Sequence, residues 1–208
     1  MRALIALGGK GPGAFPMEAS RYDRVVAADS GYDLLIGLGI MPDLVVGDLD
    51  STQFRDSLIG KGIIPCSRDK DYTDAELAIR AAMPFDEYDI IGGGEGRMDH
   101  LLSIFALFGK YGVPRAWFTA EDVMIGIRKS AGFSLPADSE LSFFPALPVA
   151  CNVEASGLKW PFSYLSPSFI SQSNRTDGPS VHIETDNPIF MRISPDIFSA
   201  LKIEGVLS

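Results

Sequence analysis

Four clusters of acidic residues carry the residue types in this chain that can do chemistry. They are ADSG at 28–31, GDLDS at 47–51, DKDYTD at 69–74 and GGGEGRMDH at 92–100. Each cluster follows a short run of β-branched or aliphatic residues, which predicts a strand that ends just before it. Carboxylates repel one another, so they gather on one rim of a sheet only where a cation holds them. The pattern predicts a Mg²⁺ ion carrying a polyphosphate, bound among Asp29, Asp48, Asp50, Asp71 and Asp99.

The pair Asp48 and Asp50 flanks Leu49 in an extended segment. Alternate residues of an extended chain share a face, so both carboxylates would point at one metal ion. A surface turn is the other reading of a DxD pattern. The metal reading is favoured by the neighbours, because Gly47 permits close backbone approach and Ser51 supplies a hydroxyl near the ion.

The segment 69–74 joins a predicted strand to a predicted helix that opens with a capping-box pattern, with Thr73 as its N-cap. Asp71 precedes the cap and is the better metal ligand. Asp74 lies in the first helical turn, where it either joins the site or complements the helix dipole. Lys70 either neutralises a phosphate or pairs with a neighbouring aspartate.

A glycine-rich stretch at 92–97 follows an apolar strand and precedes a helix. Gly93 and Gly94 let backbone N–H groups approach phosphate oxygens, which the helix N-terminus also attracts. Arg97 supplies a forked donor for a phosphate oxygen. Asp99 is predicted as a metal ligand, as the helix N-cap, or as both. His100 is either a structural hydrogen-bonding group or a catalytic one.

Strands and helices alternate over the first 120 residues, which indicates βαβ units and a largely parallel sheet. Strands are predicted at 3–7, 24–28, 44–46, 63–66, 88–91 and 116–119. Helices are predicted at 32–38, 54–59, 75–83 and 100–108, the last closed by Gly109 and Gly112. From about residue 126 helical periodicity disappears and prolines recur between short strand patterns at 140–144, 181–184 and 189–193. The predicted fold class is α/β, with a Rossmann-like domain at 1–125 followed by a small antiparallel β-sandwich at 126–208.

Composition narrows the class of protein. The chain has 208 residues and a net charge of −9, which argues against nucleic acid as a partner. No apolar run is long enough to span a membrane, and the first strand is too short for a signal-peptide core, so a cytoplasmic protein is expected. Of 27 acidic residues, 18 are Asp and 13 of those precede residue 101. Asp favours turns and metal sites, so this excess indicates sites rather than a solvated surface.

Taken together, ADSG, LGIMPDLVVGDLDS, RDKDYTD and GGGEGRMDH closely resemble the thiamine pyrophosphokinase family in order and spacing. The second half continues the resemblance with GLKWP at 157–161, QSN at 172–174 and VHIETDNP at 181–188. One departure is ADSGYD at 28–33, where the family pattern reads ADGGAN.

The resemblance implies transfer of the pyrophosphoryl group of ATP to the hydroxyl of thiamine, giving thiamine diphosphate and AMP. It implies a homodimer that binds thiamine near the subunit interface. Carried over to this chain, it implies Mg²⁺ ligands at Asp48, Asp50 and Asp71, with Asp29 and Asp99 in the same acidic group. Arg97 would contact the ATP phosphates, Trp160 would stack on thiamine, and Ser173 and Asn174 would lie near its pyrimidine.

Two other functions are compatible with parts of the pattern. One is a related pyrophosphokinase that acts on another small alcohol, such as a pterin; the thiamine-side motif at Trp160 argues against it. The other is a thiamine- or nucleotide-binding regulator with a degenerate site; retention of the aspartates and Arg97 argues against that. For the leading function, an aspartate must accept the hydroxyl proton, and Asp71 and Asp99 are the candidates.

Overall fold

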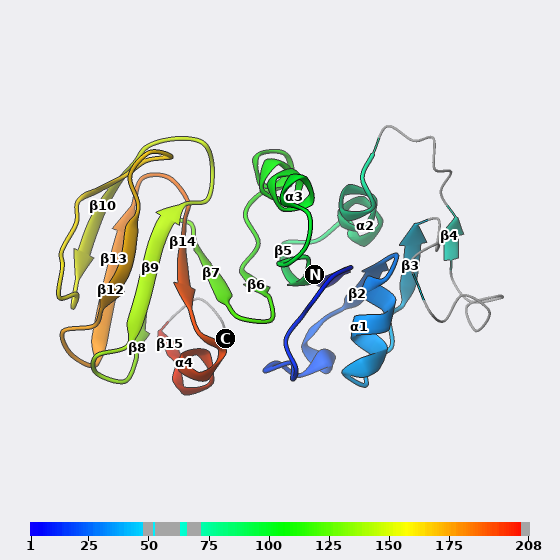
Figure 1. Ribbon diagram of the computed structural model, residues 1–208, viewed down its shortest axis with the longest axis horizontal. Coiled ribbons are helices and arrows are strands. Elements are labelled where there is room, and N and C mark those ends of the chain that lie inside the picture. The colour runs from blue at the N-terminus through cyan, green and yellow to red at the C-terminus, as the bar shows by residue number, and fades with distance from the viewer. Residues whose placement is uncertain (48–51, 53–62, 66–71, 205–208) are drawn as a thin grey trace. The chain divides into compact units, whose positions relative to one another are not determined.

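A computed structural model describes residues 1–47, Thr52, residues 63–65 and residues 72–204 (Figure 1). The predicted helix at 54–59 and the predicted site residues Asp48, Asp50, Ser51, Lys70 and Asp71 lie outside these ranges. The chain divides into two compact units. Unit 1 contains residues 1–107 and 117–120, and unit 2 contains residues 108–116 and 121–208. The predicted boundary after residue 125 stays a prediction.

Unit 1 is an α/β layer structure. Its strands are β1 (Arg2–Leu7), β2 (Arg24–Ala28), β3 (Leu44–Gly47), β4 (Ile63–Pro65), β5 (Glu87–Gly92) and β6 (Ala116–Phe118). They lie in the order β6-β5-β1-β2-β3-β4, and the four pairings from β5 to β4 are parallel. A largely parallel sheet was predicted from the alternation of elements, and this part of the prediction is confirmed.

Strand β1 lies at the centre of this sheet and is the most buried element of the unit. Ala3, Leu4, Ile5 and Ala6 are fully buried. Ile5 is paired with Val26 of β2 on one side and with Ile90 of β5 on the other. A strand covered on both faces needs this continuous apolar run rather than an alternating one.

The helices of unit 1 are η1 (Ala19–Arg21), α1 (Gly31–Gly37), α2 (Asp74–Ala82) and α3 (Met98–Tyr111), the last of which extends into unit 2. Helix α1 leads from β2 toward β3, whereas α2 leads back to β5 on the other side of β1. Right-handed crossovers that run in opposite directions place their helices on opposite faces, as Figure 1 shows for α1 and α2. The predicted cap of α2 is confirmed, because the Thr73 side chain accepts a hydrogen bond from the Glu76 N–H.

Unit 2 is formed mainly of antiparallel strands. One sheet has the order β12-β9-β14-β7 and the other the order β11-β10-β13-β8-β15. The strands are β7 (Val123–Ile127), β8 (Ser130–Ser134), β9 (Glu140–Pro145), β10 (Cys151–Ser156), β11 (Tyr164–Leu165), β12 (Ser171–Arg175), β13 (Ser180–Thr185), β14 (Ile189–Ile193) and β15 (Lys202–Glu204). Buried and exposed residues alternate along β13, which is the pattern of a sheet with one packed face.

Two details of the sequence prediction were wrong. Helix α4 (Pro195–Ala200) interrupts the predicted all-β half. Its six residues are too few to show a helical period, although Ser194 as N-cap followed by Pro195 is a recognisable start. Gly109 does not close α3 but lies inside it, and only Gly112, with φ +86°, terminates the helix. No helix in the described ranges has the length and apolar character needed to cross a membrane.

The two glycines of α3 make a matched test of this helix end. An added Cβ meets nothing within 4 Å at either position, so only backbone conformation distinguishes them. Gly109→Ala should raise the free energy of unfolding by about 0.5–1 kcal/mol, because alanine loses less entropy in a helix. Gly112→Ala should lower it by about 1–2 kcal/mol, because alanine is forced into a left-handed conformation. Urea unfolding measures both, and equal effects would mean that α3 does not end at Tyr111.

Candidate functional site at the carboxyl edge of the parallel sheet

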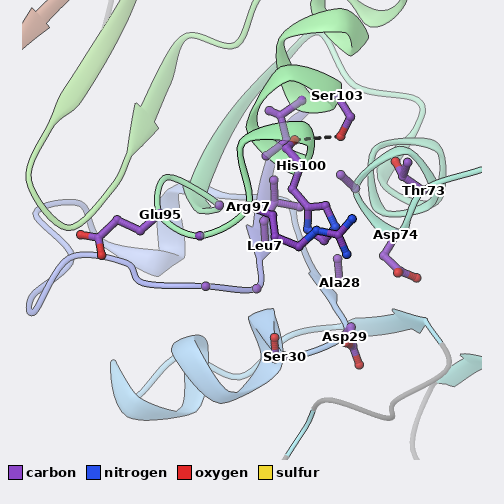
Figure 2. Close-up of a pocket in the computed structure, with 16 residues that line it drawn as sticks. Leu7, Ala28, Asp29, Ser30, Thr73, Asp74, Glu95, Arg97, His100 and Ser103 are labelled. Atoms are coloured by element: carbon purple, nitrogen blue, oxygen red, sulfur yellow. Dashed lines mark hydrogen bonds between the residues drawn. The ribbon is translucent and has the colours of Figure 1, made fainter.

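The strand order of unit 1 predicts where a ligand binds. From β1 the chain adds β2, β3 and β4 on one side, then returns to place β5 on the other side of β1. The loops that follow β1 and β5 therefore diverge, which leaves a crevice at the carboxyl ends of these strands. A cavity of about 410 Å³ lies there (Figure 2). It is lined by the residues that follow β1, β2 and β5 and by the first turns of α2 and α3.

One wall of the cavity is made of glycine backbone. Gly8 and Gly9 follow β1, and Gly93 and Gly96 follow β5. Gly9 and Gly93 have φ values of +101° and +70°, which other residues adopt only with strain. A Cβ on Gly93 would lie 3.0 Å from the Ile104 side chain, so a larger residue would also crowd this wall. Bare backbone here is suited to hold phosphate oxygens.

Two contacts join the loops after β1 and β5. The Gly93 N–H donates to the Gly8 carbonyl at 3.2 Å, beyond the last paired residues of the two strands. The Lys10 ammonium pairs with the Glu95 carboxylate at 2.8 Å. The two loops therefore form a single ledge at the cavity edge.

The helix starts add favourable partial charge. Thr73, Asp74 and Ala75 bring the N-terminus of α2 to the cavity, and Arg97 and His100 bring the start of α3 (Figure 2). Both helix N-termini carry partial positive charge and favour an anion between them. His100 lies on the cavity lining, and its carbonyl accepts a hydrogen bond from the Ser103 hydroxyl at 2.8 Å.

Asp29 follows β2 in a strained conformation. Its φ is +45°, its N–H donates to the Val46 carbonyl at 2.8 Å, and its carbonyl accepts from the Tyr32 N–H at 3.1 Å. These two bonds hold the turn that aims the side chain at the cavity rim. Backbone strain of this kind is found mainly at functional sites. The next residue, Ser30, fits against bare backbone, since a Cβ on Gly8 would lie 2.3 Å from its hydroxyl oxygen.

The carboxylates of Asp29 and Asp74 are groups that could bind Mg²⁺, but in the described residues they do not form a complete metal site. A Cβ on Gly47 would lie 3.2 Å from the Asp29 Cβ and 3.3 Å from Oδ1 of Asp74, so both side chains flank the residue that precedes Asp48. Carboxylate oxygens are ligands that Mg²⁺ prefers. Within the described ranges no group of three or more His, Cys, Asp or Glu side chains is arranged to hold a metal ion. Three of the predicted ligands, at positions 48, 50 and 71, lie outside those ranges.

Arg97 and Asp99 are paired with each other in this structure. Nε of Arg97 donates to Oδ1 of Asp99 at 3.1 Å, and the terminal nitrogen donates to Oδ2 at 2.5 Å. Asp99 lies in the first turn of α3 and is not its N-cap, so that prediction was wrong. The hydrogen bond from Arg97 is the main cause that lowers the pKa of the Asp99 carboxyl below its ordinary value.

The predicted residues on the thiamine side lie in unit 2. Trp160 is 58% exposed, and Asn174, at the end of β12, is buried. Ser173 is exposed, with φ +52°, at an irregularity in the pairing of β12 with β9. Asn174 hydrogen-bonds the backbone of Trp160, so the structure brings these two residues together.

Sequence reasoning missed several residues of the cavity. Gly8 and Gly9 were read only as the end of the first strand, and Ser30 and Ser103 were given no role. Gly8 and Gly9 directly follow the first predicted strand. Site residues were sought just after the other strands, and the same reasoning applied to β1 would have found these two glycines. Gly94, by contrast, faces away from the lining: a Cβ there would lie 2.3 Å from the Thr119 side chain.

The fold is that of an α/β protein with a cavity at the carboxyl edge of its parallel sheet. Residues 15–113 match the family model described as thiamin pyrophosphokinase, catalytic domain. The resemblance seen in the sequence is confirmed over this region, which is similar to the catalytic domain of thiamin pyrophosphokinases. The matched model is that of a catalytic domain, which supports an enzyme of this type. A search of curated proteins gives no match.

Solved structures show the same fold over nearly the whole chain. A thiamin pyrophosphokinase family protein from Enterococcus faecalis has a TM-score of 0.74 at 23% identity, covering 94% of this chain and 100% of its own. Thiamine pyrophosphokinase from Bacillus subtilis has a TM-score of 0.74 at 21% identity, with 93% and 99% covered. Thiamin pyrophosphokinase from Candida albicans has a TM-score of 0.66 at 17% identity, with 93% and 89% covered.

The pairing of Arg97 with Asp99 predicts an acid-shifted titration. A folded-state pKa below the ordinary 3.8 means that Asp99 stays ionised, and the pair intact, until the pH falls through the lowered value. Carboxyl-carbon NMR should show this midpoint, and Arg97→Gln should move it up toward the ordinary value. Lys110→Gln, which removes a cation from the other end of α3, is the control and should not move it. A wild-type midpoint at or above 3.8 would mean that the pair does not form in solution.

Proposed function

We propose that the protein transfers the pyrophosphoryl group of ATP to the hydroxyl of thiamine, giving thiamine diphosphate and AMP. The observation that carries the proposal is the cavity of unit 1, most of whose lining residues belong to the region that matches the catalytic domain. It combines glycine backbone, two helix starts and Arg97 for phosphates with carboxylates for a divalent cation. Nothing else in the described part of the chain offers this combination.

ATP is proposed to bind with its phosphates on the glycine ledge. Phosphate oxygens would lie against the glycine backbone of the ledge at Gly9, Gly93 and Gly96 and would contact the guanidinium of Arg97, helped by Ser51 and Lys70. Gly94 faces away from the cavity, so it is not part of this contact. Arg97 is mostly exposed and its partner is a single carboxylate, so a polyphosphate can compete for it. Asp29 lies across the cavity from this ledge (Figure 2).

Mg²⁺ is the proposed cofactor, held by Asp48, Asp50 and Asp71 together with Asp99. The ion would supply charge neutralisation on the phosphate oxygens. The flanking positions of Asp29 and Asp74 beside Gly47 support a cation at this end of the sheet.

The reaction needs a defined path for electrons and for one proton. The thiamine hydroxyl oxygen forms a bond to the β-phosphorus, and the bond from that phosphorus to the oxygen it shares with the α-phosphate breaks, which releases AMP. A carboxylate takes the hydroxyl proton. Asp71 and Asp99 are the candidates for this base.

Thiamine is proposed to bind against Trp160 of unit 2, with Ser173 and Asn174 near its pyrimidine. The exposed indole of Trp160 offers a face to the cationic thiazolium or to the pyrimidine ring. The net charge of −9 also favours a cationic substrate.

A homodimer is part of the proposal. The segment 160–170 exposes several large apolar side chains, namely Trp160, Tyr164, Phe169 and Ile170. Apolar side chains gathered on one surface segment commonly mark an interface.

The reaction itself is tested with the chain, ATP, Mg²⁺ and thiamine in one mixture. Chromatography should show equal amounts of AMP and thiamine diphosphate. ADP in place of AMP would point to ordinary kinase chemistry and would contradict the proposal. A pterin used in place of thiamine tests the related pyrophosphokinase, and binding of thiamine without any turnover would support the regulator instead.

The metal assignment is tested separately with Asp48→Asn and Asp50→Asn. Each should lower kcat by roughly 10²-fold or more, the scale expected when one preorganised transition-state contact is lost. Thermal unfolding should be unchanged or shifted upward, because the cluster is self-repelling. Asp177→Asn makes the same charge change at an exposed position of unit 2 and should retain activity. Full activity in both site variants would show that Mg²⁺ is held elsewhere.

A further inference from the structure

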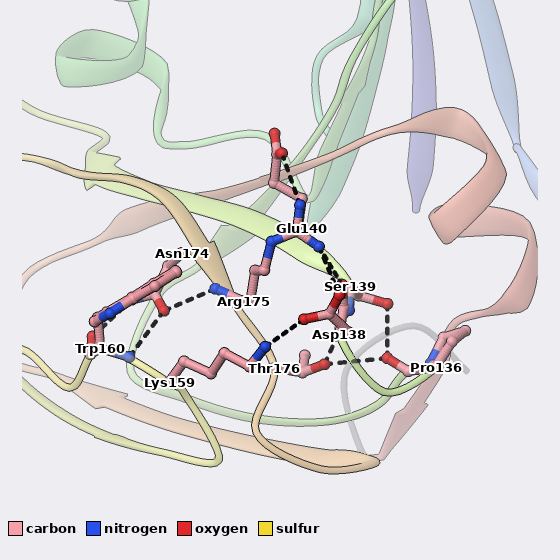
Figure 3. Close-up of polar contacts among 9 residues, drawn as sticks. All are labelled: Pro136, Asp138, Ser139, Glu140, Lys159, Trp160, Asn174, Arg175 and Thr176. Atoms are coloured by element: carbon pink, nitrogen blue, oxygen red, sulfur yellow. Dashed lines mark hydrogen bonds and ion pairs between the residues drawn. The ribbon is translucent and has the colours of Figure 1, made fainter.

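Trp160 combines an exposed side chain with a tightly held backbone. Its indole is 58% exposed, whereas Asn174, which contacts its main chain, is 1% exposed. Nδ2 of Asn174 donates to the Trp160 carbonyl at 2.7 Å, and Oδ1 of Asn174 accepts from the Trp160 N–H at 3.3 Å (Figure 3). The buried side-chain amide of Asn174 therefore hydrogen-bonds both the N–H and the carbonyl of Trp160.

The remaining hydrogen-bonding capacity of Asn174 is also used. Nδ2 donates to the Ser171 hydroxyl at 3.0 Å, and Oδ1 accepts from the Arg175 N–H at 2.8 Å. A carboxamide has two donors and an oxygen with two lone pairs, so these four bonds satisfy it. An amide in this state stabilises its own surroundings and has no donor left to offer a ligand.

A second set of contacts holds the same two segments together. Lys159, beside Trp160, donates its N–H to the carbonyl of Arg175, beside Asn174, at 2.9 Å. The Asp138 carboxylate pairs with Lys159 at 2.6 Å and with Arg175 at 2.8 Å. Asp138 itself has φ +62° and accepts a further bond from Arg175 at its carbonyl, 3.0 Å away.

Beneath these ion pairs lies a buried polar layer. Thr176 and Ser139 are buried and exchange two hydrogen bonds: the Thr176 N–H donates to the Ser139 carbonyl at 3.0 Å, and the Ser139 N–H donates to the Thr176 hydroxyl at 3.1 Å. Leu158 is bridged to Thr176, which extends the connection to the residues before Trp160. Buried polar groups satisfied in this way fix one arrangement of the backbone.

We propose that Asn174 is a positioning residue that, braced by Asp138, Lys159 and Arg175, holds Trp160 ready to stack on the aromatic substrate. The inference rests on the proposed function for the identity of that substrate. A residue whose backbone is already fixed loses less conformational entropy on binding, so the network would raise affinity for the ring without touching it. Asn174 therefore acts through Trp160.

The first test is Asn174→Ala, read out by kinetics. The KM for thiamine should rise roughly tenfold, the change that corresponds to 1.4 kcal/mol, with kcat and the KM for ATP within about twofold. Asn152→Ala is the matched control, because it removes an exposed asparagine that bonds Asp186, in the turn after β13 of unit 2. It should leave all three constants unchanged.

The second test measures the indole directly. The chain has two tryptophans, of which Trp117 is fully buried and Trp160 is exposed. Time-resolved fluorescence anisotropy of Trp160, with the signal of the Trp160→Phe variant subtracted, should show a larger fast component in Asn174→Ala. A higher thiamine KM with unchanged Trp160 anisotropy would mean that Asn174 contacts thiamine itself, and would overturn the proposal.

Asp138→Asn covers the case in which Asn174→Ala does not fold. Asp138 is exposed, so its substitution spares the buried layer while it weakens both ion pairs. The thiamine KM should rise about two- to threefold and the anisotropy should change in the same direction. Equal loss in every kinetic constant, or no change in either readout, would show that the network has only a structural role.

The fluorescence experiment also separates this proposal from the proposed reaction. It needs no substrate, so it reports on the positioning of Trp160 even if the wild-type protein forms no thiamine diphosphate. If no thiamine diphosphate forms but the anisotropy of Trp160 changes as expected, thiamine is rejected as the substrate and the positioning role of Asn174 is kept. If thiamine diphosphate forms but the anisotropy of Trp160 does not change in Asn174→Ala, the reaction is kept and the role of Asn174 is rejected.

Discussion

The reversal of strand order around β1 is the constraint on which unit 1 depends. Because β2 and β5 pair with opposite edges of β1 in parallel, the chain that follows β1 and the chain that follows β5 separate beyond the contacts that join their two loops. This separation produces the cavity, and it brings glycine backbone from two loops to the same edge. Full burial of Ile5 and its neighbours is what keeps β1 in this central position.

Like charges at this edge are compatible with the fold only because cationic groups and partial charges lie among them. Arg97 neutralises Asp99, and the starts of α2 and α3 add partial positive charge beside Asp74. The Arg97 guanidinium, which pairs with Asp99 here, is also the group that a phosphate would attract. A phosphate could therefore replace the Asp99 carboxylate as the partner of Arg97. If the proposed function holds, such an arrangement would favour binding of a polyphosphate together with its counter-cation over either one alone.

Much of unit 1 was predictable from the sequence, because its signals are local. The apolar run before Gly8 marks β1, and Thr73 with Glu76 three residues later marks the start of α2. The end of α3 was predicted ambiguously, because a glycine in sequence does not reveal its φ value, and Gly109 and Gly112 differ only there. The assignment of residues 108–116 to unit 2 and of 117–120 to unit 1 depends on contacts in space, as does the pairing of Arg97 with Asp99, and single-sequence patterns do not encode such contacts.

The residues around Trp160 illustrate the same limit. A sequence motif can place Trp160 and Asn174 near a substrate, but it cannot distinguish a residue that touches the ligand from one that holds its neighbour. The difference lies in the hydrogen bonds that Asn174 makes to the backbone of Trp160 and Arg175. The bond to Trp160 links positions 14 residues apart, a separation at which no helical or strand period connects them.

The contacts between the loops after β1 and β5 have a consequence for energetics. Because Gly93 bonds Gly8 and Lys10 pairs with Glu95, the two loops share one set of interactions. Free-energy changes caused by substitutions in the two loops are then not additive, since the first substitution already disturbs what the second would remove. The ledge thus behaves as one thermodynamic element assembled from segments more than 80 residues apart in the chain.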